Sequence, residues 1–116
     1  MANTFVPVNP VKPAAATETL IYQVPDVGGT TAMLLSLIAA NNSGSAGAPD
    51  TITVRRLLDG ETLSTADREI LGEVVVNNQD TFIFNDKLLL GQDEQLTVES
   101  ANGDIVFTAS IIEFSA

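Results

Sequence analysis

The sequence predicts an all-β protein: an antiparallel β-sandwich, jelly-roll-like or Ig-like, with about eight short strands and an extended N-terminal arm. Three observations predict this class. From Thr19 onward, apolar and polar residues alternate with a period of two over most of the chain. Turn residues (Gly, Asn, Asp and Pro) interrupt the alternation about every eight to twelve residues. No helical pattern is long enough for a β-α-β unit, so we expect antiparallel pairing.

The first 17 residues form the predicted arm, and residues 18–116 form the predicted sandwich domain. Pro7, Pro10 and Pro13 fix φ and lack a backbone donor, so neither a helix nor a central strand is expected here. Two interpretations stay open: a frayed terminus, or an arm that lies across a neighbouring subunit because it is more apolar than a solvated tail needs. The candidate interaction residues are Phe5, Val6, Pro7, Val8, Pro10 and Val11.

The next part of the chain is predicted to contain three strands. Alternation over residues 19–24 places Leu20 and Tyr22 on the same face of the first strand. Residues 31–40 are apolar on both faces. We interpret them as a strand buried on both sides, because a short helix among strands would need its own tertiary support. Residues 51–58 alternate and predict a strand with one wet face.

Several short elements follow. The polar residues 61–67 predict at most one helical turn. Residues 69–76 predict a strand, with Gly72 as a β-bulge. Short strands are predicted at 81–84 and 87–90, separated by an Asn-Asp turn.

The strongest local signal in the chain is the dipeptide Asn102-Gly103. Both residues accept the left-handed conformations of a two-residue type I′ turn. We therefore expect a β-hairpin that joins a strand at 94–100 to a strand at 104–114.

The composition excludes most common catalytic chemistry. The chain has 116 residues, with fifteen Asp or Glu, five Lys or Arg, no His, no Cys and a formal net charge of -10. Without His or Cys there is no Ser-His-Asp or Cys-His nucleophile, no thiolate or imidazole zinc site and no disulfide. We expect no enzyme activity and no cofactor. The negative charge repels phosphate, so nucleic acid is not an expected partner.

Carboxylates are the remaining candidates for a site. The acid pairs Asp67/Glu69 and Asp93/Glu94 lie beside turns or strand ends, where carboxylates are usually solvated, so we expect no catalytic residue. No segment matches a calcium loop, and the Asp and Asn turn clusters supply about two ligands each, so we expect no metal site. The apolar runs are far shorter than the roughly 20 residues of a membrane span, so no membrane partner is expected.

Segments along the whole chain resemble a known group of proteins. The segments that carry the resemblance are MANTF (1–5), ETLIYQVP (18–25), an apolar strand from GTT (29–31) to AN (40–41), KLLLG (87–91), EQLTVES (94–100) and ASIIE (109–113). Their order is similar to that in small virion structural proteins of tailed phages, particularly marine cyanophages.

The resemblance implies a β-sandwich located in the virion. As a capsid decoration (cement) subunit it would bind the outer surface of the particle; the first alternative is a neck or tail component. It implies other phage structural proteins, the major capsid protein or a neck or tail protein, as partners, a homo-oligomer, and no catalytic residues. The second alternative is a carbohydrate-binding sandwich. That alternative needs exposed aromatic residues, and the chain has one Tyr and no Trp.

Overall fold

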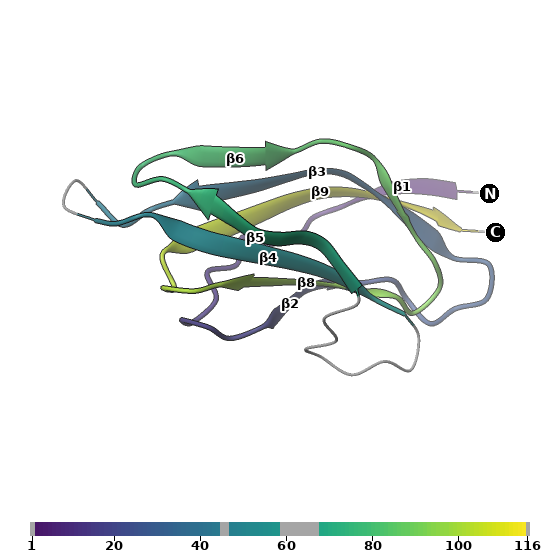
Figure 1. Ribbon diagram of the computed structural model, residues 1–116. Coiled ribbons are helices and arrows are strands. Elements are labelled where there is room, and N and C mark those ends of the chain that lie inside the picture. Colours follow the sequence, from purple (N-terminus) through teal and green to yellow (C-terminus); the bar gives the residue numbers. More distant parts are fainter. Residues whose placement is uncertain (1, 45–46, 59–67, 116) are drawn as a thin grey trace.

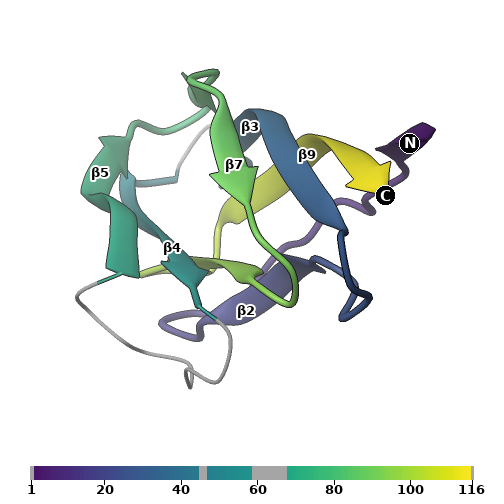
Figure 2. The ribbon, with the colours of Figure 1, turned by 90° about the vertical axis from the view of Figure 1, so that its right-hand side faces the viewer.

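The computed structural model describes residues 2–44, 47–58 and 68–115. Within these residues it contains nine strands in two antiparallel sheets, which pack face to face (Figures 1 and 2). The predicted all-β sandwich is confirmed. The helical turn expected at 61–67 lies outside the described residues.

We call the two layers sheet A and sheet B. Sheet A has the order β1 (Ala2–Val6), β9 (Ile105–Ser115), β3 (Thr31–Asn41) and β6 (Thr81–Phe84), and β7 (Leu88–Leu90) also pairs with β3. Sheet B has the order β2 (Thr19–Gln23), β8 (Gln95–Ser100), β4 (Asp50–Leu57) and β5 (Glu69–Val76). In Figure 2, β7, β3 and β9 lie in one layer, and β5, β4 and β2 lie in the other.

The strand pairing is nested along the chain. The first strand pairs with the last, β2 with β8, β3 with β6 and β7, and β4 with β5. Because β6 and β7 follow one another along the same edge of β3, they together occupy the place of one strand. In a jelly roll, a long antiparallel hairpin folds over so that its eight strands form two sheets. The observed pairing has this arrangement, so the topology is a jelly roll and not the Ig-like order.

The core lies between β3 and β9 of sheet A and β4 and β8 of sheet B. Period-two alternation places one side of each strand inward. The largest fully buried side chains are Phe107, Leu34, Leu37, Ile52, Leu57, Leu90, Leu96, Ile105, Ile111, Val24, Val54 and Val98.

Residues 31–40 form a strand, as predicted, but its two faces differ. Leu34 and Leu37 face the core, whereas Met33 and Ile38 on the other face are only half-buried. A bulge between Leu34 and Ser36 adds one residue to β3, so that Leu34 before the bulge and Leu37 after it both face the core. The outer face of β3 therefore carries apolar side chains that the chain itself does not fully cover.

The prediction that Leu20 and Tyr22 share a face is wrong. A bulge between them shifts the register of β2 against β8. As a result Ile21 and Tyr22 are both buried, while Leu20 is 44% exposed. The bulge predicted at Gly72 is confirmed, because β5 has an extra residue opposite β4 between Leu71 and Val74.

The predicted Asn102-Gly103 hairpin is also wrong. The strands on either side lie in different sheets, and only Gly103 of the pair has a positive φ, +78°. The connection is instead held by the buried carboxylate of Asp50, which accepts the backbone N–H of Asn102 at 2.9 Å and that of Asp104 at 3.2 Å. The dipeptide marks a turn, but it does not determine which sheet the following strand enters.

The N-terminal segment is extended and runs along its own sandwich. Strand β1 pairs with β9 beside the C-terminus (Figure 1). Further on, Val11 and Phe107 exchange backbone hydrogen bonds of 2.9 and 2.7 Å. The segment then crosses to sheet B, where the Ala16 N–H donates to the Ser100 carbonyl at 2.8 Å.

Candidate functional site

The outer face of sheet A carries an ordered row of apolar side chains. The strand registers place Phe5 beside Ile112, Ile112 beside Met33, and Met33 beside Leu89. A second pair, Ile38 and Ile83, lies further along β3 and β6. We call these side chains the sheet A face: Phe5, Met33, Ile38, Ile83, Leu89 and Ile112.

Much of this face is accessible to solvent. Phe5 is 73% exposed, Leu89 62% and Ile83 57%. The strands of sheet A contain a single charged residue, Glu113, and its carboxylate points inward to Tyr22. Single exposed apolar residues are common on protein surfaces, but a contiguous uncharged apolar patch is typical of an interaction site.

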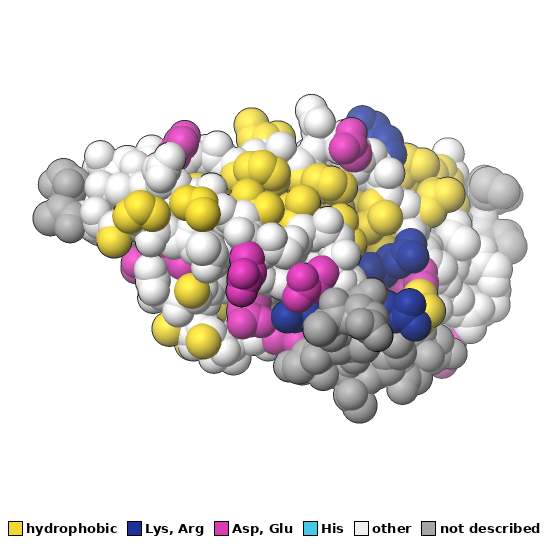
Figure 3. All heavy atoms as spheres, in the orientation of Figure 1, with side chains coloured by type: hydrophobic (Ala, Val, Ile, Leu, Met, Phe, Trp, Pro, Cys, Tyr) yellow, Lys and Arg dark blue, Asp and Glu magenta, His cyan; other side chains and the backbone are white. Residues whose placement is uncertain are grey.

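The apolar surface continues around the edge of sheet A at β6. Here β6 and β5 are edge strands of different sheets and do not pair. Half-buried side chains pack against the core along this side: Ile70, Leu71, Val74, Phe82, Phe84 and Leu88. In Figure 3, hydrophobic side chains form a band over this side of the molecule, and most of the charged side chains in the view lie below it, over sheet B.

The outer face of sheet B has the opposite character. Arg55 lies among three carboxylates, at 3.0 Å from Glu99, 3.3 Å from Glu69 and 3.5 Å from Glu18. The Glu18 side chain is only 4% exposed, and its second oxygen accepts the Thr97 hydroxyl at 2.6 Å. Burial opposes the positive charge of Arg55, but the bond to Glu99 and the nearby carboxylates outweigh it, so the pKa of Arg55 is raised. The cluster holds β4, β5 and β8 together and presents net negative charge.

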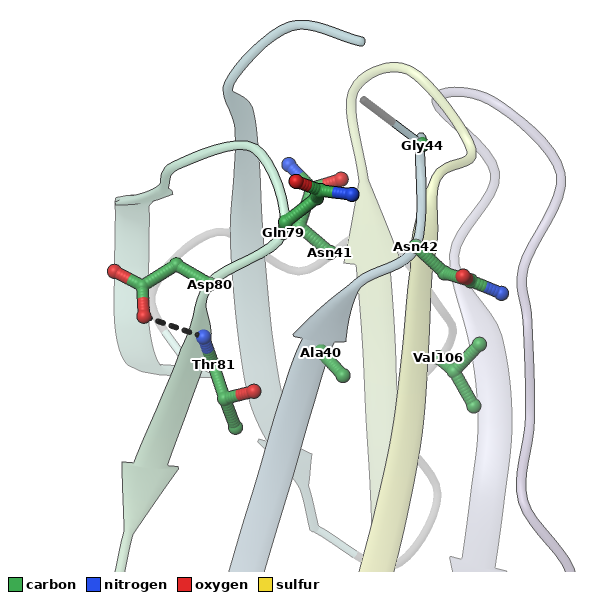
Figure 4. A pocket seen from close by; sticks show the side chains of 8 residues that line it. All are labelled: Ala40, Asn41, Asn42, Gly44, Gln79, Asp80, Thr81 and Val106. Atoms are coloured by element: carbon green, nitrogen blue, oxygen red, sulfur yellow. Dashed lines mark hydrogen bonds between the residues drawn. The ribbon is translucent and has the colours of Figure 1, made fainter. Parts of the chain in front are cut away.

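A pocket of about 410 Å³ opens at one end of the sandwich (Figure 4). Its lining residues are Ala40, Asn41, Asn42, Gly44, Gln79, Asp80, Thr81 and Val106. The Asn41 amide is committed to the fold, since it donates to the carbonyls of Ala48 and Val76. Asp80 accepts the Thr81 N–H, and the Asp80 and Asn42 side chains point in opposite directions. The described lining residues therefore offer neither an aromatic platform for a sugar nor a convergent set of polar groups.

A polar contact between the two sheets joins β2 to β9 near the termini. The Tyr22 hydroxyl donates a hydrogen bond to the Glu113 carboxylate, and Tyr22 is 8% exposed. Burial, the hydrogen bond and the negative charge of Glu113 all raise the pKa of Tyr22.

We expect Tyr22 to ionise only well above the ordinary tyrosine pKa of about 10, together with alkaline unfolding. The folded state prefers the protonated phenol, so this contribution to stability is complete below pH about 10 and is lost as pH rises beyond it. Absorbance of tyrosinate measures this directly, because the chain has one Tyr and no Trp. Glu113→Gln should lower the pKa of Tyr22, while Glu73→Gln, an exposed control, should not. Reversible ionisation of the folded protein near pH 10 would contradict the assignment.

The structure divides the sequence-predicted interaction residues into two groups. Val6, Val8 and Val11 pack against the core, whereas Phe5, Pro7 and Pro10 stay exposed. Only Phe5 belongs to the sheet A face. Contact of this segment with a neighbouring subunit stays a prediction. Sequence reasoning missed the other members of the face. The two-sided apolar pattern of residues 31–40 and 105–112 was the signal for Met33, Ile38 and Ile112, and the uninterrupted apolar segments 82–84 and 88–90 were the signal for Ile83 and Leu89.

The carboxylates considered as catalytic or metal-binding candidates have structural roles where they are described. Asp93 accepts the Gln23 amide at 2.5 Å, and Glu94 accepts the Gly91 N–H at 2.5 Å. Asp67 lies outside the described residues. Over the described ranges, no three acidic residues come together as metal ligands. The same part of the chain contains no helix with the length and apolar character of a membrane span.

Comparisons with protein-family models, with curated proteins and with solved structures found no match to this chain.

Proposed function

We propose that the protein is a non-enzymatic structural protein of a phage virion, a capsid decoration or cement subunit that binds the outer surface of the particle. Its partners are other phage structural proteins and further copies of itself. The sequence resemblance and the sheet A face together support this function.

The observation that carries the proposal is the difference between the two outer faces. The sheet A face is apolar and free of charged side chains within the described strands, whereas sheet B presents the Arg55 cluster. An interface core is typically depleted in charge, while a face in contact with water tolerates it. A subunit bound to a particle needs this asymmetry, with sheet A toward protein and sheet B toward solvent.

The topology is compatible with this role. Jelly rolls occur in viral capsid proteins, but also in lectins and cupins, so the fold alone does not assign a function. The lectin alternative is less well supported, because aromatic side chains are absent from the described lining of the pocket. A glycan array tests it directly: a specific hit that is lost in Gln79→Ala would favour sugar binding.

Occupancy on purified particles tests the proposed function. Phage particles are prepared with the natural protein, with Ile83→Asp or with Leu89→Asp, and its copy number is measured by quantitative mass spectrometry. Both residues are more than half exposed, so the fold should tolerate the changes. We expect at least a tenfold loss of occupancy, because the aspartate carboxylate would be desolvated in the interface.

Val75→Asp is the matched control. Val75 is 58% exposed but lies on β5 of sheet B. It should leave occupancy unchanged. Absence of the natural protein from the particles would refute the virion role, and equal loss in all three variants would refute the assignment to the sheet A face. Hundreds of copies would support a decoration subunit, and a single ring would support a neck or tail component.

A further inference from the structure

We propose that two copies of this chain pair through β1, antiparallel and edge to edge, so that sheet A continues from one copy into the other. The inference rests on the proposed function for its setting, because it names a second copy as one partner of the assembled subunit. The geometry itself comes from β1 and the sheet A face.

The outer edge of β1 has no strand partner among the described residues. Strand β1 is the end of sheet A and pairs only with β9. Its outward backbone N–H and C=O groups therefore form a template for another extended strand. Proteins usually protect such an edge with charge, proline or a bulge.

The other edge strands are protected in this way or, as for the three residues of β7, by being very short. Strand β5 carries Glu69 and Glu73 and a bulge, and β2 also has a bulge. Strand β6 is bracketed by Asp80 and Asp86, so two copies paired there would bring carboxylates together. Strand β1 itself contains no charge, proline or bulge; Pro7 follows its last residue, and the first charged residue after it is Lys12.

An antiparallel pair about a twofold axis keeps the apolar face continuous. With Thr4 on the axis, Phe5 lies opposite Asn3 of the other copy; with Phe5 on the axis, the two Phe5 residues lie opposite each other. In both registers both Phe5 side chains are on the same side of the joined sheet. The row from Leu89 through Met33 and Ile112 to Phe5 would then continue into the same row of the second copy.

Charge favours a second copy at this edge over a basic partner. Two chains of net charge -10 repel wherever their carboxylates project. That repulsion is weakest at β1, where residues 2–11 carry no charge. A basic partner would find no carboxylate there to pair with. The partner that fits this edge best is therefore another uncharged strand, namely β1 of a second copy of the chain.

The contact between the two β1 strands is small. The chain exposes 6010 Å² in total, and a stable interface takes about 800 Å² from each partner. A five-residue edge with one exposed aromatic is smaller than that. We therefore expect a weak, concentration-dependent dimer in solution that is strengthened on a particle by high local concentration.

Single-cysteine variants test the pairing, since the natural chain has no Cys. Under mild oxidation, Thr4→Cys or Phe5→Cys should give at least ten times more covalent dimer than Ser110→Cys. Ser110 is exposed on the outer face of β9, away from the edge. The better of the first two variants identifies which residue lies on the axis, because only directly opposite residues reach disulfide distance.

Sedimentation of the full chain supplies the second measurement. Asn3→Asp should raise the dimer dissociation constant at least tenfold, since it places a carboxylate between the joined strands, opposite Phe5 or Pro7 of the other copy in the two registers, where it would be desolvated. Ser110→Asp should not change the dissociation constant. A chain that stays monomeric across the micromolar range, or a dimer broken by Ser110→Asp but not by Asn3→Asp, would overturn the proposal. Monomers on particles would refute the pairing and leave the virion role intact; a β1-paired dimer missing from particles would refute the virion role and leave the pairing.

Discussion

Replacing Asp50 by asparagine should lower the free energy of unfolding by about 3 kcal/mol. The Asp50 carboxylate is 1% exposed and accepts three backbone N–H groups, from Thr51 at 2.8 Å, Asn102 at 2.9 Å and Asp104 at 3.2 Å. Hydrogen bonds to a charged group are worth about 1.5–3 kcal/mol each, and an asparagine NH₂ would face one of these donors. Two of the weakened hydrogen bonds, those from Asn102 and Asp104, hold the connection in which the chain crosses from β8 of sheet B to β9 of sheet A.

Urea unfolding of Asp50→Asn and the natural protein measures this effect. Asp80→Asn is the matched control, because Asp80 also accepts a backbone N–H, from Thr81 at 2.8 Å, but is exposed. The control should lose less than about 1 kcal/mol. Equal losses in the two variants would show that the Asp50 carboxylate does not hold the crossing.

Replacing Arg55 by methionine should lower the free energy of unfolding by about 2 kcal/mol. The change removes the cation that forms ion pairs with Glu18, Glu69 and Glu99, and Glu18, at 4% exposure, loses its contact with Arg55. Removing one partner of a fully buried ion pair costs about 3–5 kcal/mol. We expect less here because Glu69 and Glu99 are about one-third exposed (34% and 27%), and solvent screens them.

Two further variants separate charge from packing in this cluster. Arg56→Met is the control: Arg56 donates to the Leu89 carbonyl at 3.2 Å in an exposed bond, so the loss should be small. The double variant Arg55→Met/Glu18→Gln should be more stable than Arg55→Met, because it also removes the buried negative charge whose ion pair with Arg55 is lost. A double variant less stable than the single one would contradict the electrostatic explanation.

The strands themselves could be predicted from the sequence. Alternation is a local property, and it placed the strands from Thr19 onward close to their observed bounds. The prediction failed where a single residue changed the register, as in β2, where a bulge separates Leu20 from Tyr22. A bulge inserts only one extra residue into a strand. The sequence therefore does not reveal it unless a glycine is present, as Gly72 is in β5.

Strand order could not be predicted, because pairing in a jelly roll is nonlocal. Asn102-Gly103 has the chemistry of a hairpin turn, yet the partners of β8 are β2 and β4, and those of β9 are β1 and β3. Nothing within a few residues of the turn encodes that choice. The buried Asp50, more than fifty residues earlier, stabilises the crossing.

The sheet A face depends on the same nonlocal information. Phe5 was a candidate from the sequence, but Leu89 and Met33 join it only because β7, β3, β9 and β1 are neighbours in the sheet. A two-sided apolar strand is compatible with a fully covered sheet or with one that offers a face to a partner. The topology is needed to decide between these two cases: it shows that no described element of the chain covers the outer face of sheet A.

A cryo-electron microscopy map of particles that carry this protein would show directly which face of the sandwich contacts the particle. We expect density for the sandwich on the outer surface of the capsid, with Met33 and Leu89 of the sheet A face against a neighbouring protein and the Arg55 cluster in solvent. Density with sheet B against the particle and sheet A in solvent would contradict it.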